Sequence, residues 1–312
     1  MTKACYVGVA GKARKVKKIY VGVANKARKV KKAYVGVGGV ARPFFSAEEA
    51  KLSYYGTVTP LSKARPMLAA TTVGNYGLFG GGGEGTYFYS AVVDAYSTTL
   101  VRSTPTALSE GRYNLAATTV GNYALFGGGY ASLGGEDGQT FTVDAYSTAL
   151  VRTTPTGLDE NRESLAATTV GNYGVFGGGY GYGSVSDRVD AYSESLVHKN
   201  ATGLTDGREA LAATTVGNYA LFGGGAQSSS ALPTVDAYSA TLVRSTPTAL
   251  SQERSNLAAT TVGNYALFGG GGRESSAYSS DVEAYTVDGG GSKPSNPDPP
   301  KPGGSWPDKT PP

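Results

Sequence analysis

Apolar and polar positions alternate in short runs that return at a regular spacing through the body of the chain. The run LAATTV at residues 115–120 is followed by a Gly-Asn turn, YALFGGG, TVDAYS and a fourth run from Leu150. Each run has the length of a strand and ends in turn residues, so each unit predicts four antiparallel strands. The signature VGNY marks the first turn of every unit, beginning at Val73, Val120, Val170, Val216 and Val262.

A spacing of 46 to 50 residues between the VGNY copies fits either a propeller blade or a helical solenoid unit. Glycine, tyrosine and the alternating runs favour strands and therefore the propeller. The first three strands occur five times, but only four fourth strands follow a third strand. The missing copy aligns with LSYYGTV at 52–58 when Arg65 is set against Arg112. We predict an all-β fold: a five-bladed β-propeller at 46–287, closed by the N-terminal strand 52–58, which completes the last blade.

The two ends of the chain differ from this body. A 14-residue repeat, YVGV followed by a turn pair and KARKVKK, begins at Tyr6 and Tyr20, with a partial copy at Tyr34. Its valines and internal glycine favour β-hairpins over a helix, so residues 1–45 predict a small basic β-hairpin module. Residues 288–312 are rich in Pro and Gly and predict a disordered tail.

Charge separates the module from the body. Twelve of the 28 Lys and Arg lie in residues 1–42, which contain no acid, while the other sixteen share the rest of the chain with all 24 Asp and Glu. We expect the module to dock electrostatically on an acidic partner, such as other particle or virion subunits. Nucleic acid is an alternative partner, because the same cations can neutralise phosphates. The predicted docking residues are Lys12, Arg14, Lys15, Lys17, Lys18, Lys26, Arg28, Lys29, Lys31 and Lys32.

Several kinds of chemistry are excluded by composition. With one cysteine, Cys5, and one histidine, His198, the chain cannot build a disulfide framework, a multi-cysteine zinc site or a metal radical centre. The glycine runs end strands and precede no helix, so they are not phosphate loops. We therefore predict no metal, no cofactor and no enzymatic activity. A glycosidase using carboxylates among Glu136, Asp137 and Asp187 stays open, although nothing in their spacing supports it.

Membrane insertion is also not expected. No eighteen-residue apolar run is present, and the N-terminus lacks the apolar segment of a signal peptide.

The repeats resemble kelch motifs. Kelch units carry a glycine doublet after the second strand, an aromatic residue in the third and an arginine before the next unit. Here these are Gly127-Gly128, Tyr146 and Arg162. The resemblance covers 52–287, although the tryptophan usual in the fourth strand is replaced by Leu150-Val151. The KARKVKK hairpins followed by such repeats also resemble kelch-like proteins of Gram-positive gut bacteria and their phages. This likeness implies a virion or tail-associated role.

The copies differ most in the loop between the second and third strands. In a four-stranded meander this loop shares one face with the linker to the next blade. The five loops are rich in Tyr, Ser and Gly, which supply contact area and adaptable hydrogen bonds at binding surfaces. We predict that they bind a host-surface glycan or protein. The predicted ligand-binding residues are Tyr87, Phe88, Tyr89, Tyr130, Glu136, Asp137, Tyr180, Tyr182, Arg273 and Tyr278.

One charged pair recurs in every unit and predicts a structural clamp rather than five active sites. The arginines are Arg65, Arg112, Arg162, Arg208 and Arg254, and the acids are Asp94, Asp144, Asp190, Asp236 and Glu283. In the fourth strand, His198 replaces an arginine that stands at position 102, 152 or 244 in other units.

The sequence thus predicts a non-enzymatic recognition or structural appendage on the surface of a virion or extracellular particle, within an oligomeric assembly. Phage host attachment by glycan binding is its leading form. Two alternatives remain open: a decoration protein that self-assembles on a particle without binding a host, and a nucleic-acid-binding protein that uses the basic arm.

Overall fold

The structure is a computed structural model of the 312-residue chain. Between residues 6 and 46 it describes the backbone of six strands. Beyond them it describes residues 54–84, 89–133, 136–272 and 278–287, except for the side chains of Leu133 and Glu136. The chain divides into two units, Met1–Thr57 and Val58–Pro312. The predicted tail at 288–312 lies outside the described residues.

The first unit contains three antiparallel strand pairs, as the 14-residue repeat predicts. They are β1 (Tyr6–Val9) with β2 (Lys12–Lys15), β3 (Tyr20–Val23) with β4 (Lys26–Lys29), and β5 (Lys32–Val37) with β6 (Val40–Ser46). Val9 pairs with Lys12 and Val23 with Lys26, so each of these turns has two residues. Such short connections explain why the pattern forms hairpins.

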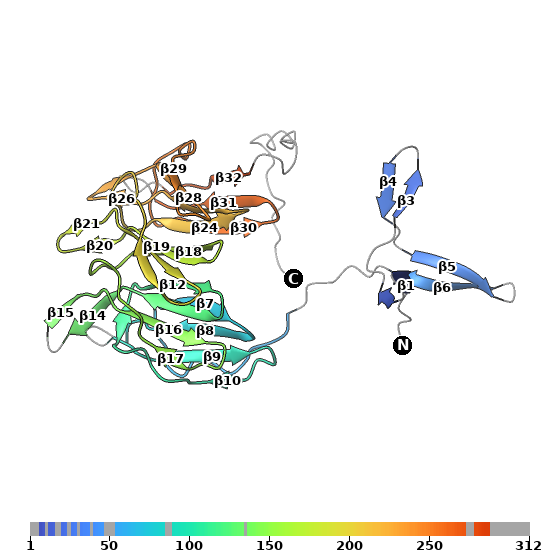
Figure 1. The fold of residues 1–312 in the computed structure, drawn as a ribbon, viewed down its shortest axis with the longest axis horizontal. Coiled ribbons are helices and arrows are strands. Elements are labelled where there is room, and N and C mark those ends of the chain that lie inside the picture. The colour runs from blue at the N-terminus through green and yellow to red at the C-terminus, as the bar shows by residue number, and fades with distance from the viewer. Residues whose placement is uncertain are drawn as a thin grey trace, which may run out of the picture. The chain divides into compact units, whose positions relative to one another are not determined.

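The second unit is a series of small antiparallel sheets, one for each sequence repeat (Figure 1). Repeat sheet 1 contains β7 (Ala69–Val73), β8 (Tyr76–Gly80), β9 (Val93–Ser97) and β10 (Arg102–Ser103). Repeat sheet 2 contains β12 (Ala116–Val120), β13 (Tyr123–Gly127), β16 (Val143–Ser147) and β17 (Arg152–Thr153). Repeat sheet 3 contains β18 (Ala166–Val170), β19 (Tyr173–Gly177), β22 (Val189–Ser193) and β23 (His198–Asn200). Repeat sheet 4 contains β24 (Ala212–Val216), β25 (Tyr219–Gly223), β28 (Val235–Ser239) and β29 (Arg244–Ser245). Repeat sheet 5 contains β30 (Ala258–Val262), β31 (Tyr265–Gly269) and β32 (Val282–Thr286).

Three of the variable loops form hairpins of their own. They are β14 (Tyr130–Leu133) with β15 (Glu136–Gln139), β20 (Tyr180–Gly181) with β21 (Ser184–Val185), and β26 (Ala226–Gln227) with β27 (Ser230–Ala231). All three project on the same side of the repeat sheets, at the left of Figure 1. The short strand β11 (Arg112–Tyr113), in the linker before β12, pairs with β14. Variable loop and linker therefore share one face, as predicted; we call it the loop face.

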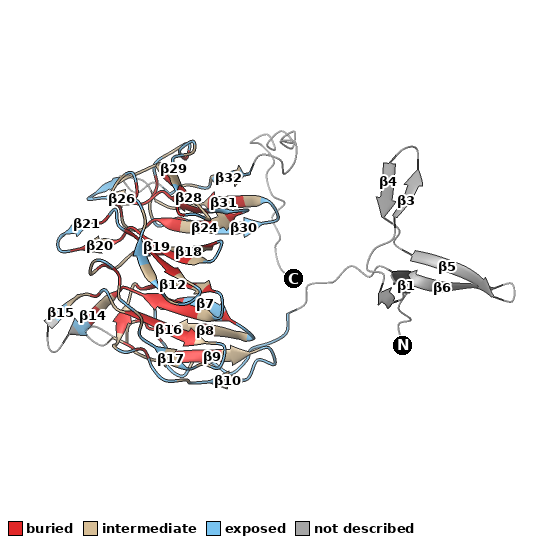
Figure 2. Cartoon of the chain, in the orientation of Figure 1, coloured by how far each residue is buried: buried red, intermediate tan, exposed pale blue. Residues whose placement is uncertain are grey.

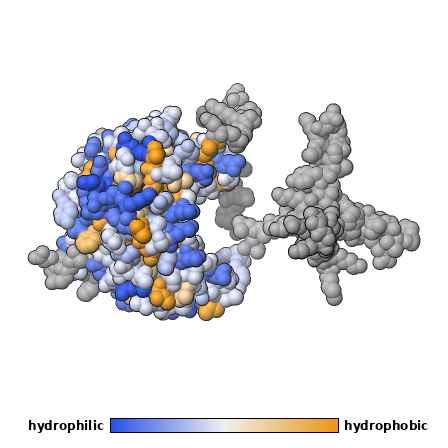
Figure 3. Space-filling view, viewed as in Figure 1, coloured by the Kyte–Doolittle hydropathy of each residue, from blue (hydrophilic) through white to orange (hydrophobic). Residues whose placement is uncertain are grey.

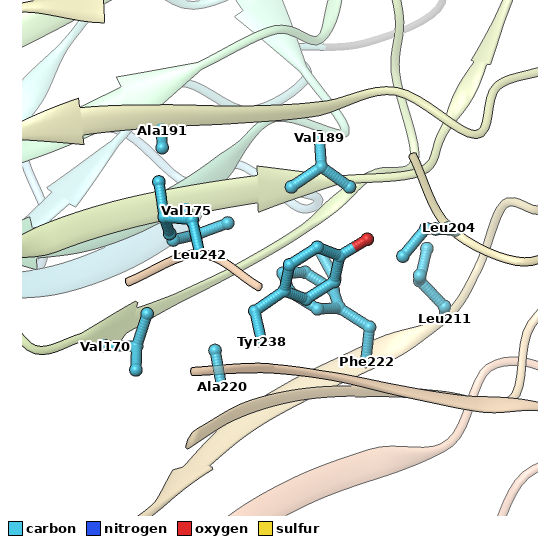
Figure 4. Close-up of a cluster of buried hydrophobic side chains, with 11 residues drawn as sticks. Val170, Val175, Val189, Ala191, Leu204, Leu211, Ala220, Phe222, Tyr238 and Leu242 are labelled. Carbon is cyan, nitrogen blue, oxygen red and sulfur yellow. The ribbon is translucent and has the colours of Figure 1, made fainter. Parts of the chain in front are cut away.

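The hydrophobic core lies between neighbouring repeat sheets. Figure 4 shows the cluster between sheets 3 and 4, where Phe222 and Tyr238 of sheet 4 lie close to Val189 of sheet 3. The rings of Phe222 and Tyr238 meet edge to face, with centroids 5.9 Å apart. Equivalent clusters join sheets 1 and 2, 2 and 3, and 4 and 5. Sheets 2, 3 and 4 thus each bury one face against the preceding sheet and the other against the following one.

A cavity of about 330 Å³ lies between sheets 4 and 5. Between sheets 3 and 4 the corresponding space is occupied by Leu242, from the turn after the third strand, which packs near Val170 and Val175 (Figure 4). Alignment of VDAYSATL with VEAYTVDG sets Gly289 in the place of Leu242. Residue 289 lies outside the described residues, so the described part of sheet 5 supplies no counterpart of Leu242.

Repeat sheet 5 is more exposed than the others (Figure 2). The Val262 side chain is 56% exposed, whereas Val120, at the same place in sheet 2, is 0% exposed. Residues 54–58, most of the predicted closing strand, are exposed and lie in no strand, and residues 52 and 53 lie outside the described residues. The described part of sheet 5 has three strands. Closure by 52–58 therefore stays a prediction.

The face of the second unit that Figure 3 shows is mainly polar, with apolar residues in small spots. The described residues include no helix long and apolar enough to cross a bilayer.

Candidate ligand-binding site

The loop face brings together side chains from two repeats. In β11, Tyr113 pairs with Tyr130 of β14, and in the β14–β15 hairpin Tyr130 pairs with Gln139. Tyr89, from the variable loop of repeat 1, reaches the same place. The linker and two variable loops thus position one group of aromatic side chains.

Tyr89, Tyr113 and Tyr130 form a cluster in which every ring contacts the other two; we call it the tyrosine cluster. Ring centroids are 5.2 Å apart for Tyr89 and Tyr113, 5.9 Å for Tyr89 and Tyr130, and 5.5 Å for Tyr113 and Tyr130. The Tyr89 hydroxyl donates a hydrogen bond to Asp137 Oδ2 at 3.0 Å. Each ring is half-buried, so part of every ring is open to solvent. Such rings offer a preformed apolar surface with polar groups at its edge.

The Tyr89 and Tyr113 hydroxyls stay protonated at neutral pH. Burial, followed by the hydrogen bond to Asp137, raises the pKa of Tyr89 to about 12. Burial also raises the pKa of Tyr113 above its ordinary value. Both phenols can therefore act as hydrogen-bond donors.

A hollow of about 400 Å³ lies where the linkers of all five repeats converge. One residue of each repeat at its edge has left-handed backbone geometry, with φ between 51° and 58°: Met67, Asn114, Ser164, Ala210 and Asn256. The following leucine of each repeat also lines it. Non-glycine residues in this region carry a conformational cost and often mark functional sites. Its volume falls in the range of small-ligand pockets.

Two carboxylates lie beside this hollow. Glu163 accepts hydrogen bonds from Asn114 Nδ2 and Gln139 Nε2, both at 3.1 Å. Burial, followed by repulsion from Glu163, raises the pKa of Glu209 above its ordinary value. The loop face therefore combines aromatic rings, a hollow and acidic groups.

This arrangement makes stability depend on pH through Glu209. Because its pKa is raised on folding, the proton favours the folded state below the ordinary carboxyl pKa of about 4.3, and this contribution is lost as pH rises through the raised value. We expect Glu209→Gln to be more stable than the parent chain at neutral pH, with the difference vanishing in acid. Urea unfolding between pH 4 and 7 would measure it.

The control is Glu84→Gln, which should behave in the opposite way. A hydrogen bond from Ser90, followed by one from Lys63, lowers the pKa of Glu84. Its contribution is present at neutral pH and is lost as the pH falls, so Glu84→Gln should be the less stable chain at neutral pH. Equal pH profiles for the two variants would contradict the assignment.

The other predicted site residues lie apart from the cluster or outside the described residues. Tyr278 is 89% exposed, and Tyr182, also exposed, accepts a hydrogen bond from Asn161 Nδ2 at 2.9 Å. Tyr180 is half-buried and its backbone pairs with Glu163. Only the backbone of Glu136 is described, in β15. Tyr87, Phe88 and Arg273 lie outside the described residues.

The basic arm is described by its backbone. Among the predicted docking residues, Lys12, Arg14 and Lys15 lie in β2, Lys26, Arg28 and Lys29 in β4, and Lys32 in β5. Lys17, Lys18 and Lys31 lie outside the described residues.

Sequence reasoning missed Tyr113, Asn114, Glu163 and Glu209. They stand in the linker before the first strand, beside the repeated arginine and leucine, whereas the sequence prediction rested on the loops between the second and third strands. The position directly after that arginine does vary, as Pro66, Tyr113, Glu163, Glu209 and Ser255. A comparison of this position across the repeats could have identified it as part of the variable face.

The recurring charged pairs form, as predicted, and both partners are buried in the first four repeats, whereas Glu283 of the fifth is partly exposed. Arg112 Nη2 lies 2.7 Å from Asp144 Oδ2, with both side chains 0% exposed, and it also donates to the Phe126 carbonyl at 3.1 Å. Burial lowers the pKa of Arg112, and Asp144 opposes that shift. The Ser109 amide donates to the same carboxylate at 3.2 Å, so each pair also ties its linker to its sheet.

The lone histidine belongs to one of these pairs. His198 Nε2 lies 2.6 Å from Asp190 Oδ1, where Arg152 contacts Asp144 in the preceding repeat. It is an outer-strand substitution, as predicted. Among the described residues, no group of three or more His, Cys, Asp or Glu side chains could hold a metal ion.

No family model matches the sequence, and no curated protein matches it. Solved structures do match. One, titled "Structure of YjhT", is a kelch-like propeller with a TM-score of 0.57 and 15% identity; the match covers 73% of this chain and 83% of that one. At this identity the likeness shows the fold alone, which is all-β and β-propeller-like.

Proposed function

We propose that this chain is a non-enzymatic recognition protein that binds a glycan on its loop face. In this proposal the five repeat sheets are blades of a kelch-like propeller. The observation that carries the proposal is the tyrosine cluster, whose partly open rings lie beside the hydrogen-bonded Asp137 and near the hollow. Pyranose rings present apolar C–H faces to aromatic rings and hydroxyls to carboxylates. A glycan therefore fits this combination better than an extended peptide does.

The location on a virion or particle surface follows from the sequence resemblance and is part of the proposal. The basic arm would dock the chain on other subunits of that particle. The loop face would remain free for a host-surface glycan.

The glycosidase alternative receives no support from the described contacts. Asp137 accepts the Tyr89 hydroxyl, and no contact among the described residues joins it to Asp187. A glycosidase needs two carboxyl groups set across one glycosidic bond.

The test is an array of bacterial surface glycans probed with the full chain, followed by titration of any ligand found. Removing one stacked aromatic ring costs about 1 to 2 kcal/mol, so Tyr130→Ala and Tyr113→Ala should each weaken binding roughly 10-fold. Tyr89→Phe keeps the ring and removes the hydroxyl, so a smaller loss is expected.

The matched control is Tyr278→Ala, because Tyr278 is an exposed loop tyrosine that makes no ring contact with the cluster among the described residues. Its binding should equal that of the parent chain. Absence of any glycan ligand, or equal losses from Tyr278→Ala and Tyr130→Ala, would count against the proposal.

A further inference from the structure

Neighbouring repeat sheets meet through one interface that occurs four times. Its apolar part is a phenylalanine ring of one sheet lying on a glycine of the sheet before it. A Cβ atom at Gly80 would lie 2.8 Å from Cε1 of Phe126. The same close approach joins Gly127 to Phe176, Gly177 to Phe222, and Gly223 to Phe268.

Ladders of hydrogen bonds cross the same interface, and three of them have a defined donor and acceptor. At the hollow, the amide of Asn114 donates to the carbonyl of Met67 at 3.2 Å. Along the inner strands, the Thr119 hydroxyl donates to the Thr72 carbonyl. Each bond recurs at the next three interfaces: the amides of Ser164, Ala210 and Asn256, and the hydroxyls of Thr169, Thr215 and Thr261, all donate to the preceding repeat.

The third ladder runs in the opposite direction. The amide of Gly82 donates to the carbonyl of Arg112, in the following repeat, at 2.9 Å. Gly129, Gly179 and Gly225 repeat this bond to Arg162, Arg208 and Arg254.

Repeat sheet 1 carries one unused half of this interface, which we call the leading face. It has the Met67 amide, the Thr72 hydroxyl and the Arg65 carbonyl, for which the described residues supply no partner across an interface. Its aromatic pair, Phe79 and Tyr96, is only half-buried, although Tyr146 in sheet 2 is fully buried.

Repeat sheet 5 carries the other half, which we call the trailing face. It has the Asn256 and Thr261 carbonyls, the Gly271 amide and the bare Gly269, again without a partner from a following sheet among the described residues. Val262 is 56% exposed on this face, where Val216 of sheet 4 is 4% exposed. In β32, exposed residues alternate with partly buried ones (Figure 2).

The two faces complement each other group by group. The Met67 amide and the Thr72 hydroxyl of the leading face correspond to donors whose acceptors, on the trailing face, are the Asn256 and Thr261 carbonyls. In the other direction, the Gly271 amide of the trailing face corresponds to a donor whose acceptor is the Arg65 carbonyl. The ring of Phe79 corresponds to those that lie on glycine in the four internal interfaces. A second copy of this chain carries the whole complementary set of groups.

We propose that the trailing face of one copy binds the leading face of a second copy, so that the chains assemble head to tail. Packed interfaces adopt one geometry and deform little. Sheets 1 and 5 lie at the two ends of the series, and no strand pairing or backbone hydrogen bond among the described residues joins them. A second copy uses the same geometry unchanged.

This inference goes beyond the glycan-binding proposal and does not depend on it. A head-to-tail interface is heterologous, so it generates a ring or an open chain of copies. Each copy added would present another loop face, and several weak glycan sites would then act together.

The test blocks each face separately in the full chain. A Cβ at Gly77 of the leading face would have nothing within 4 Å, whereas at Gly174 of sheet 3 it would lie 3.1 Å from Thr118 in the preceding sheet. Gly77→Glu therefore leaves the single chain intact and obstructs only an incoming copy. Val262→Glu does the same for the trailing face.

We expect the parent chain to increase in mass with concentration by light scattering, and each variant alone to remain a single copy. An equimolar mixture of the two should give a dimer, because one variant keeps its trailing face and the other its leading face. Val101→Glu, which changes a 64% exposed valine outside both faces, should assemble as the parent does.

Two results would overturn the proposal. A parent chain that stays monomeric at every concentration would favour the ring closed within one chain that the sequence predicts. A parent assembly that neither variant alters would indicate association elsewhere, for example through the basic arm. Glycan titration of the two variants separates this test from the proposed function, because neither substitution touches the loop face.

Discussion

Replacing Asp144 with alanine should lower the free energy of unfolding by about 3 to 5 kcal/mol, because the substitution leaves the Arg112 guanidinium buried without its nearest counterion. Both side chains are 0% exposed, and Arg112 Nη2 lies 2.7 Å from Asp144 Oδ2. The carboxylate also accepts from the Ser109 amide and hydroxyl, so the linker loses its attachment as well. Urea unfolding followed by tyrosine fluorescence would measure the change.

The matched control is the exposed pair of Lys63 and Glu84, whose side chains lie 2.9 Å apart on the surface. Lys63→Ala should cost about 0 to 1 kcal/mol, as exposed ion pairs do. The double variant Arg112→Met/Asp144→Leu should recover much of the loss, because buried pairs can be replaced by apolar groups at little cost. If Asp144→Ala and Lys63→Ala cost the same, the buried pair is not a clamp.

The sequence predicted that these pairs form but not how deeply they are buried. The regular recurrence of one arginine and one acid in every repeat indicates a contact. Burial depends on the linker that covers the pair, and the Ser109 contact with Asp144 joins residues 35 positions apart. No pattern of residues near Arg112 or Asp144 in the sequence indicates that the linker at Ser109 will cover them.

The tyrosine cluster illustrates a different limit. Its members Tyr89 and Tyr130 were predicted from the variability of their loops. Tyr113 was missed because it stands in a linker that otherwise repeats, and it reaches the cluster only because β11 pairs with β14. Pairing between a loop hairpin and a linker strand is a tertiary property that strand propensity does not show.

The two unused faces could not be predicted from the strand sequences at all. The fifteen residues LAATTVGNYALFGGG are identical at 115–129 and 257–271. Yet Val120 is 0% exposed in the first copy and Val262 is 56% exposed in the second. The same residues lie in the core where another sheet follows them and on the surface where none does. Their burial therefore depends on the neighbouring sheet and not on their own sequence.

The same contrast predicts that one substitution will have different effects in equivalent positions. Phe222→Ala should cost about 3 to 5 kcal/mol, because its fully buried ring packs on Gly177 of the preceding sheet and on Tyr238. Phe79 makes the same edge-to-face contact within its own sheet, with centroids 5.9 Å from Tyr96, but no sheet precedes it. Phe79→Ala should therefore cost clearly less.

The comparison is cleanest in the Val262→Glu background, in which the trailing face is blocked and the leading face of every chain stays open. Chemical unfolding of both variants in that background measures the preceding sheet's contribution to one ring. Equal losses would mean that the glycine contact adds nothing to stability and that Phe222 is held by its own sheet alone.

In the chain without Val262→Glu, head-to-tail assembly would cover Phe79, so the cost of Phe79→Ala should rise with protein concentration while that of Phe222→Ala does not. If the cost of Phe79→Ala did not change with protein concentration, Phe79 would not be covered by a second copy, and this result would argue against the head-to-tail interface.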